Sequence, residues 1–291
     1  MGEVTKISWT THTWNPWQGC RKVSPGCKNC YAEALVEKRM GRKFSEIRRS
    51  SPMTFNAPLK WEADLLKRPD LPIGKSFVFA CSISDFFIGE ADAWRDEAWE
   101  IIRRTPHLTY QILTKRPERI AEHLPKTCFT CGEPWDMHDP MISEGIASTF
   151  PCVNGGSLKM WPWPNVWLGT SIENQKYAEI RIPQLVAVPA VVHFLSCEPL
   201  LGPIDFDRCS NVNADSTKIC DPHLHLDDIE WVIVGGESGP NFRTMDLDWA
   251  RSIRDQCKAA GVPFFYKQGN GIRSEMNTLL DGREWREMPS V

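Results

Sequence analysis

The chain has 291 residues, of which 42% are hydrophobic and 24% charged, as is typical of a globular protein with a substantial core. No apolar run reaches the roughly 18–20 residues of a membrane-spanning helix, and the N-terminus lacks the apolar stretch of a signal peptide. We therefore expect a cytoplasmic protein. Its eleven cysteines then indicate metal binding rather than disulfides, because the cytosol keeps thiols reduced.

The net charge of −3 is unevenly distributed along the chain. Residues 1–70 contain 13 Lys and Arg against 7 Asp and Glu, and the remaining residues are acidic. The densest basic run consists of Lys38, Arg39, Arg42, Lys43, Arg48 and Arg49. Such a run can follow the phosphates of a nucleic acid, or it can simply be a solvated helix face.

The first expected strand lies within residues 6–16, and a group of three cysteines follows it. Cys20, Cys27 and Cys30 have the spacing C-x6-C-x2-C and precede a helix-like run. Iron–sulfur clusters use closely spaced cysteine thiolates, and three of them leave one iron of a [4Fe–4S] cluster open. The alternative is a zinc site completed by a distant fourth ligand, such as His12 or a later cysteine.

Six short apolar runs follow, and helix-compatible segments lie between most of them. The runs span residues 75–85, 108–117, 165–174, 191–200, 230–239 and 262–270. The helical segments include 91–104, 174–187 and 246–260, the last ending at Gly261. This alternation predicts an α/β fold with a partial (βα) barrel of about six to seven parallel strands. A doubly wound open sheet is the main alternative.

Polar residues follow each apolar run, where the carboxyl ends of parallel strands form the active face of such folds. Helix caps and turns explain single Ser, Thr or Asp residues, but they explain poorly a carboxylate or lysine at every strand end. We therefore expect a shared site. Its candidate residues are Ser84, Asp85, Thr114, Lys115, Ser171, Glu173, Glu198, Gly235, Gly236, Glu237 and Lys267. For Glu237 the structural alternative is a helix cap or a pair with Arg243.

Two segments interrupt the alternation of strands and helices, and both are expected to be insertions into a single domain spanning residues 1–291. Residues 125–164 contain Cys128, Cys131, His138 and Cys152, a Cys3His set that suits tetrahedral zinc. The segment has few aliphatic residues, so zinc would supply its folding energy, unless the cysteines are merely scattered in a loop. Residues 205–229 are expected to form an irregular loop. The looser spacing there leaves metal binding open for Cys209, Cys220, His223 and His225.

Seven motifs, distributed in order along nearly the whole chain, carry a resemblance to a known family. They are TWNPWQGCRKVSPGCKNCYAE, SISDFF, ILTKRPERI, NVWLGTSIEN, HFLSCEPLLGPI, WVIVGGESGP and AAGVPFFYKQGN. Together they resemble the phage Gp37/Gp68-type proteins, a three-cysteine-motif family, although Gly269 replaces a frequent tryptophan. The cysteine arrangement also resembles that of radical S-adenosylmethionine (SAM) enzymes. Their usual spacing is C-x3-C-x2-C with an aromatic before the last cysteine, whereas this chain has a longer first gap and Asn29 there.

The resemblance implies a radical SAM enzyme, with Cys20, Cys27 and Cys30 holding a [4Fe–4S] cluster and the polar strand-end residues holding SAM. It further implies modification or repair of phage DNA bases or nucleotides in the host cytoplasm. An electron donor such as flavodoxin or ferredoxin and a companion protein would be the partners. The alternative is a zinc-stabilised nucleic-acid-binding protein without redox chemistry. In the enzyme hypothesis the basic segment 38–49 and the tryptophan-rich residues 161–167 could bind DNA.

Overall fold

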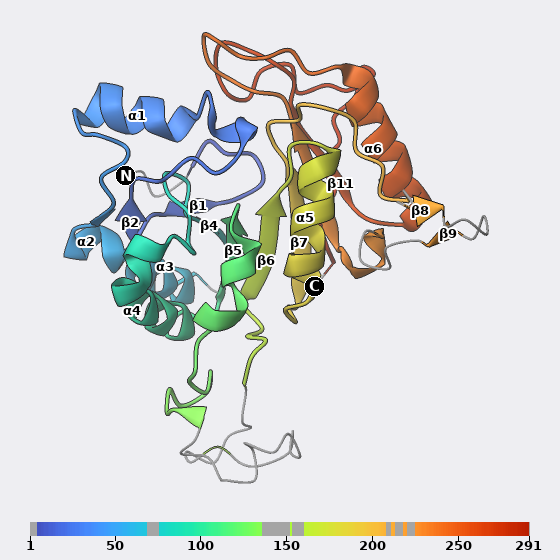
Figure 1. The fold of residues 1–291 in the computed structure, drawn as a ribbon. Coiled ribbons are helices and arrows are strands. Elements are labelled where there is room, and N and C mark those ends of the chain that lie inside the picture. The colour runs from blue at the N-terminus through green and yellow to red at the C-terminus, as the bar shows by residue number, and fades with distance from the viewer. Residues whose placement is uncertain are drawn as a thin grey trace.

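A computed structural model of the protein describes residues 5–68, 76–135, 152, 160–207, 211–212, 218–219 and 225–290. Its centre is a parallel sheet of seven strands that curls into a half-barrel (Figure 1), in the order β1-β4-β5-β6-β7-β10-β11. The strands are β1 (His12–Trp14), β4 (Ser76–Ala80), β5 (Leu108–Thr114), β6 (Val166–Ser171), β7 (Val192–Cys197), β10 (Trp231–Gly235) and β11 (Phe264–Gln268). Each lies within an apolar run expected from the sequence, which confirms the predicted partial barrel.

Helices connect the strands, and all but the first of them pack against the convex face of the sheet (Figure 1). They are α1 (Tyr31–Met40), α2 (Pro52–Phe55), α3 (Ala57–Leu66), α4 (Asp92–Arg103), α5 (Gln175–Val186) and α6 (Leu247–Ala260). Short 3-10 helices span Pro25–Cys27, Gly89–Ala91, Pro117–Arg119, Ala121–His123 and Leu226–Asp228. Two small antiparallel pairs join β2 (Trp17–Gln18) to β3 (Arg48–Arg49) and β8 (Asn211–Val212) to β9 (Lys218–Ile219).

Helix α6 illustrates why these boundaries could be predicted. Its first turn is capped by Asp246, whose carboxylate accepts a hydrogen bond from the backbone of Asp248. Its last turn ends at Gly261, whose φ of 71° lies in the left-handed region that glycine adopts without strain. Between these signals, Ala250, Ile253 and Cys257 are buried against the sheet.

The concave face of the half-barrel is filled by a layer of aromatic side chains. Trp9, from the segment before β1, packs edge-on against Trp231 with ring centroids 6.1 Å apart. The ring of Phe194 occupies the space beside Gly169, where a Cβ would approach it to 2.5 Å. The layer consists of Trp9, Phe79, Trp167, Phe194, Trp231 and Phe265. Because these rings fill the interior, a site on the concave side must lie near one of the barrel's two ends.

Within the described part of the chain, no helix combines the length and apolar character needed to cross a membrane. The two predicted insertions are described only in part. Of residues 125–164 the structure describes 125–135, 152 and 160–164, and of residues 205–229 it describes 205–207, 211–212, 218–219 and 225–229. Their definition as insertions therefore stays a prediction.

Candidate functional site

The cysteine segment, residues 19–31 with Cys20, Cys27 and Cys30, lies across the carboxyl ends of the strands. All three thiols are half-buried, and none forms a disulfide with another cysteine that the structure describes. Hydrogen bonds join this segment to residues that follow β4, β5, β6 and β10. The three cysteines are thus held over the edge where the predicted strand-end residues gather.

The residues after β4 hold both ends of the cysteine segment. Ser84 Oγ donates to the Gly19 carbonyl over 2.5 Å, and the Tyr31 hydroxyl donates to the Ser82 carbonyl over 2.5 Å. Gly19 has a φ of 91°, and a Cβ there would lie 2.6 Å from the Glu46 carbonyl oxygen. Only glycine therefore fits at the start of the segment.

Arg116, which follows β5, contacts the first cysteine. Its guanidinium donates to the Arg21 carbonyl at 2.9 Å and lies 3.8 Å from Cys20 Sγ. The same guanidinium pairs with Asp85 at 2.9 Å, and Asp85 also accepts a hydrogen bond from Thr114 at 2.7 Å. Burial and then the charge of Asp85 raise the pKa of Cys20 to about 12, despite the opposing effect of Arg116. Asp85 and Thr114 thus position Arg116 beside the thiol.

Glu173, which follows β6, is the most enclosed carboxylate of the site. It is fully buried between Lys115 and Arg181, and Arg181 Nη1 lies 3.1 Å from Glu173 Oε2. Ser24, within the cysteine segment, donates to Glu173 Oε1 over 2.6 Å. A side chain at Gly26 would place its first carbon 2.5 Å from Glu173 Cγ. The cysteine segment therefore rests directly on this ion-pair group.

The electrostatic environment of Cys27 favours its thiolate. Burial alone would raise the pKa of Cys27, but the ammonium of Lys115 and hydrogen bonds from Ser24 and the backbone lower it below its ordinary value. Ser24 Oγ lies 3.7 Å from Cys27 Sγ. A thiolate is the form of cysteine that binds metal, so the surroundings of Cys27 favour metal binding.

Glu237, which follows β10, binds the cysteine segment next to Cys30. Its Oε2 accepts a hydrogen bond from Asn29 at 2.9 Å, and Arg243 pairs with its Oε1 at 2.5 Å. Burial opposes ionisation, but the hydrogen bonds from Arg243 and Asn29 leave the pKa of Glu237 below its ordinary value. The structural alternative for Glu237, a pair with Arg243, is therefore present.

Glu198 and Lys267, after β7 and at the end of β11, form the remaining ion pair of this edge. Lys267 Nζ lies 3.0 Å from Glu198 Oε1, and Ser196 donates to Glu198 Oε2 over a longer 3.3 Å. A Cβ at Gly235 would lie 2.3 Å from Glu198 Oε1, so a side chain there would displace this carboxylate. Neither charge is as fully hydrogen-bonded as those of Asp85, Glu173 or Glu237.

The structure joins most of the predicted strand-end residues through direct contacts or through the cysteine segment. The backbone of Ser171 accepts a hydrogen bond from Arg181 at 2.7 Å, while a side chain at Gly236 would collide with Asn270 at 2.8 Å. Arg116, which pairs with Asp85, was recognised from the sequence as a polar residue that follows β5, although it was not chosen as a site residue. Sequence reasoning missed three other partners of the carboxylates: the hydroxyl of Ser24, the amide of Asn29 and the guanidinium of Arg181.

A second group of cysteines forms a candidate metal centre in the connection between β5 and β6. The sulfur atoms of Cys128, Cys131 and Cys152 lie within 4.8 Å of one another, and those of Cys128 and Cys152 are 3.9 Å apart. Gly132 donates to the Cys128 carbonyl at 2.8 Å, and its φ of 82° makes the tight turn that brings the C-x2-C pair together. This set could bind a metal ion.

Other predicted metal ligands lie outside the described residues. This applies to His138, the expected fourth ligand, and to Cys209, Cys220 and His223. His225 is described, and its Nδ1 lies 3.7 Å from an Asp207 carboxylate oxygen. The Cys3His composition of the first set and metal binding by the second stay predictions.

The buried charges around Glu173 make a testable prediction about stability. Glu173→Gln would leave the buried Arg181 and the half-buried Lys115 without their counter-ion and is expected to lower the free energy of unfolding by about 3–5 kcal/mol. Urea denaturation would measure the loss. Glu179→Gln, at an exposed position on the following helix α5, is the matched control and should change stability by less than about 0.5 kcal/mol. Equal stability of the two variants would contradict the prediction.

Comparison with known proteins identifies a family for this chain. The family model described as "Protein of unknown function (DUF5131)" matches residues 4–289, almost the whole chain. No curated protein and no solved structure matches the chain.

Proposed function

The chain belongs to the DUF5131 family, whose description states no activity, and we propose that it is a radical SAM-type enzyme. In this proposal Cys20, Cys27 and Cys30 hold a [4Fe–4S] cluster, as the resemblance to three-cysteine-motif proteins implies. One observation carries the proposal. Hydrogen bonds join the segment with the three thiols to the residues after four parallel strands, at the edge where such barrels place their chemistry.

The residues present fit such a cluster. Three thiols free of disulfides are the donors that iron–sulfur clusters use, and three rather than four leave one iron open to a ligand. Arg116 beside Cys20 and Lys115 beside Cys27 are cations that lower the pKa values of these thiols. Burial nevertheless raises the pKa values of Cys20 and Cys30, so of the three cysteines Cys27 has a pKa below its ordinary value. When bound, the cluster and SAM would supply an electron and a carbon-centred radical, and the protein would supply orientation and exclusion of water.

Glu198 and Lys267 are the best candidates to hold the amino-acid end of SAM. The Glu198 carboxylate would bind the ammonium of that group, and the Lys267 ammonium would bind its carboxylate. The two side-chain charges lie 3.0 Å apart, so both could contact the same amino-acid group. Asp85, Glu173 and Glu237 are also strand-end carboxylates, but cations, amides and hydroxyls already occupy their oxygens. Their role in the proposal is to position the cysteine segment rather than to contact SAM.

This assignment predicts a loss of SAM affinity in Glu198→Gln. The substitution keeps the size of the side chain but removes the charge, so the affinity should decrease by about 1.5–3 kcal/mol, the range for a charged hydrogen bond. Calorimetry on the anaerobic, iron-loaded protein would measure it. Glu118→Gln, at an exposed position just after β5, is the control and should bind SAM as the parent does. Unchanged affinity in Glu198→Gln would place this residue outside the SAM site.

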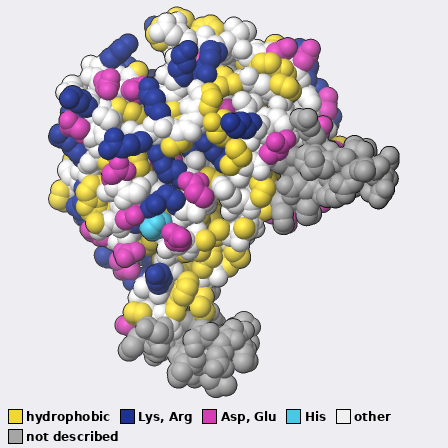
Figure 2. Space-filling model, in the orientation of Figure 1, with side chains coloured by type: hydrophobic (Ala, Val, Ile, Leu, Met, Phe, Trp, Pro, Cys, Tyr) yellow, Lys and Arg dark blue, Asp and Glu magenta, His cyan; other side chains and the backbone are white. Residues whose placement is uncertain are grey.

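A nucleic acid or nucleotide, in modification or repair of DNA bases, is the substrate class that we propose, following the resemblance to phage proteins. The basic run that includes Lys38, Arg39 and Lys43 is exposed on and after α1. However, Arg48 pairs with Glu46 and Arg49 with Glu97, each at 2.5 Å. Figure 2 shows Lys and Arg interleaved with Asp and Glu on the face where α1 lies. Phosphate contacts would therefore come from individual cations rather than from a uniformly basic patch.

A flavodoxin or ferredoxin, as electron donor, and a companion protein are the protein partners in this proposal.

A zinc-stabilised nucleic-acid-binding protein without redox chemistry is the alternative. The convergence of Cys128, Cys131 and Cys152 favours a metal in the β5–β6 connection under either hypothesis. The two differ at Cys20, Cys27 and Cys30, which would hold zinc in the alternative. Protein purified without oxygen should be brown and contain iron if the enzyme proposal is correct. A colourless protein that contains zinc alone would support the binding protein.

A further inference from the structure

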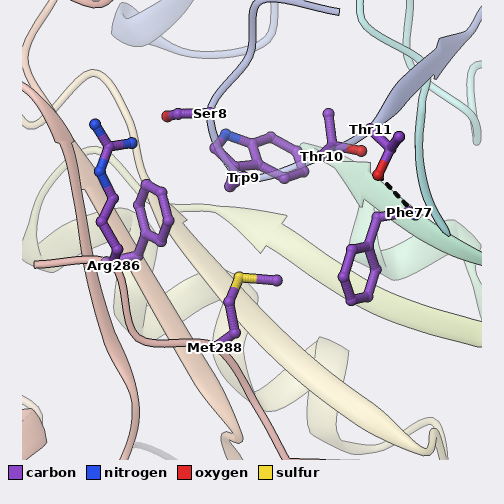
Figure 3. A pocket seen from close by; sticks show the side chains of 8 residues that line it. Ser8, Trp9, Thr10, Thr11, Phe77, Arg286 and Met288 are labelled. Carbon is purple, nitrogen blue, oxygen red and sulfur yellow. Dashed lines mark hydrogen bonds between the residues drawn. The ribbon is translucent and has the colours of Figure 1, made fainter. Parts of the chain in front are cut away.

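A pocket lies at the amino-terminal end of the half-barrel, away from the cysteine segment. It comprises about 470 Å³, a volume typical of small-molecule sites. Residues before β1, at the starts of β4 and β11, and near the C-terminus line it (Figure 3). They are Ser8, Trp9, Thr10, Thr11, Phe77, Phe265, Arg286 and Met288. The layer of aromatic side chains on the concave face separates this pocket from the carboxyl edge.

The walls of the pocket can hold a flat apolar group. Trp9 and Phe77 present rings, and Met288 adds a polarisable thioether that adapts to aromatic surfaces (Figure 3). Phe265 is the third aromatic residue that lines the pocket. Trp9 is fixed from behind by Phe79, with ring centroids 4.6 Å apart. The shape of this wall is therefore set by the core of the barrel.

The indole N–H of Trp9 is a buried donor without an acceptor among the described residues. Trp9 is 3% exposed, and its Nε1 makes no hydrogen bond to any residue that the structure describes. In Figure 3 this nitrogen is at the end of the ring that faces Ser8 and Arg286. A buried polar group without a partner costs about 1–3 kcal/mol, so this donor is available to a ligand that brings an acceptor.

Arg286 is the charged side chain among the lining residues. Its guanidinium is fixed over the ring of Phe265 at 5.1 Å, while its carboxylate partner Glu284 lies at a long 3.6 Å. Thr10 donates to the His12 carbonyl, whereas Thr11 Oγ1 accepts from the backbone of Phe77, which leaves the Thr11 O–H able to donate. The Arg286 cation, the Trp9 N–H and the hydroxyls of Ser8 and Thr11 therefore lie beside aromatic rings in this pocket, which is the pattern that recognises an anion with an apolar body.

We infer that this pocket binds a small aromatic carboxylate. The ring of the ligand would pack against Trp9 and Phe265, and its carboxylate would accept hydrogen bonds from Trp9 Nε1 and from the Arg286 guanidinium. The aromatic layer separates this site from the three cysteines, so the inference is independent of the function proposed above.

Indole N–H resonances of 15N-tryptophan-labelled protein test the inference, with benzoate as the probe and benzyl alcohol as its neutral counterpart. Trp9→Phe identifies the Trp9 resonance by its disappearance. Benzoate should shift this resonance with a dissociation constant in the millimolar range, as expected for so few non-hydrogen atoms. Arg286→Gln should weaken benzoate binding about tenfold or more, whereas benzyl alcohol should bind weakly to both proteins.

Arg283→Gln is the matched control. Its guanidinium lies over the ring of Trp285 at 3.7 Å and does not line the pocket, so benzoate should bind to this variant as to the parent protein. Three outcomes would overturn the inference: no shift of the Trp9 resonance by benzoate, equal benzoate affinity in Arg286→Gln and the parent, or equal affinity for benzoate and benzyl alcohol. All variants except Trp9→Phe keep the aromatic core, so folding does not decide the result.

Discussion

Cys27→Ala protein reconstituted without oxygen is expected to contain no iron–sulfur cluster. A cluster held by three thiolates loses an obligatory ligand with any one of them, so Cys20→Ala and Cys30→Ala should behave alike. The fold should persist, because the cysteine segment lies over the strand ends while the main core lies between the sheet and the helices. Iron and sulfide analysis would measure the loss, and circular dichroism would establish folding.

Cys257→Ala is the control for this experiment. Cys257 is a free cysteine buried in α6, so its replacement removes a thiol without touching the cysteine segment. Its iron content should equal that of the parent protein. Retention of iron in all three single variants of Cys20, Cys27 and Cys30 would refute the cluster assignment and, with it, the proposed enzyme.

Removal of zinc is expected to unfold the connection between β5 and β6 while the half-barrel stays folded. We expect about one zinc per chain, since Cys128 and Cys152 are buried beside Cys131 in a segment with few aliphatic side chains. Chelation or Cys131→Ser should then make residues 125–164 susceptible to limited proteolysis. Mass spectrometry of the fragments would locate the cleavage sites.

The two metal predictions serve as controls for each other. Cys27→Ala should lose iron and keep zinc, whereas Cys131→Ser should lose zinc and keep iron, because the two thiol groups lie in separate segments of the chain. A tilted ring contact between Phe129 and Trp163, with centroids 5.4 Å apart, joins the second segment to the core. If zinc-free protein resists protease between residues 125 and 164 as the parent does, the contact of Phe129 with Trp163 is sufficient to fold the connection. The zinc prediction would then be wrong.

Secondary structure could be predicted from the sequence because its signals are local. Apolar runs of four to eight residues, alternating with amphipathic segments, indicate parallel strands and connecting helices. The run at 230–239 contains β10 (Trp231–Gly235), and the segment 246–260 contains α6 (Leu247–Ala260) with its stop at Gly261. The C-x2-C spacing at Cys128 likewise indicated a metal site, since two such thiols lie on one tight turn.

The sequence alone determined which strand ends carry charged groups, but only the tertiary structure decided what those groups do. Ser24 meets Glu173 across 149 positions, and Asn29 meets Glu237 across 208. Such pairings depend on the path of the cysteine segment over the barrel, which no local pattern encodes. The position of Trp9 on the concave face is a similar case. Burial of its ring among the aromatic side chains stabilises the fold, and this stabilisation depends on strands that are distant in the chain.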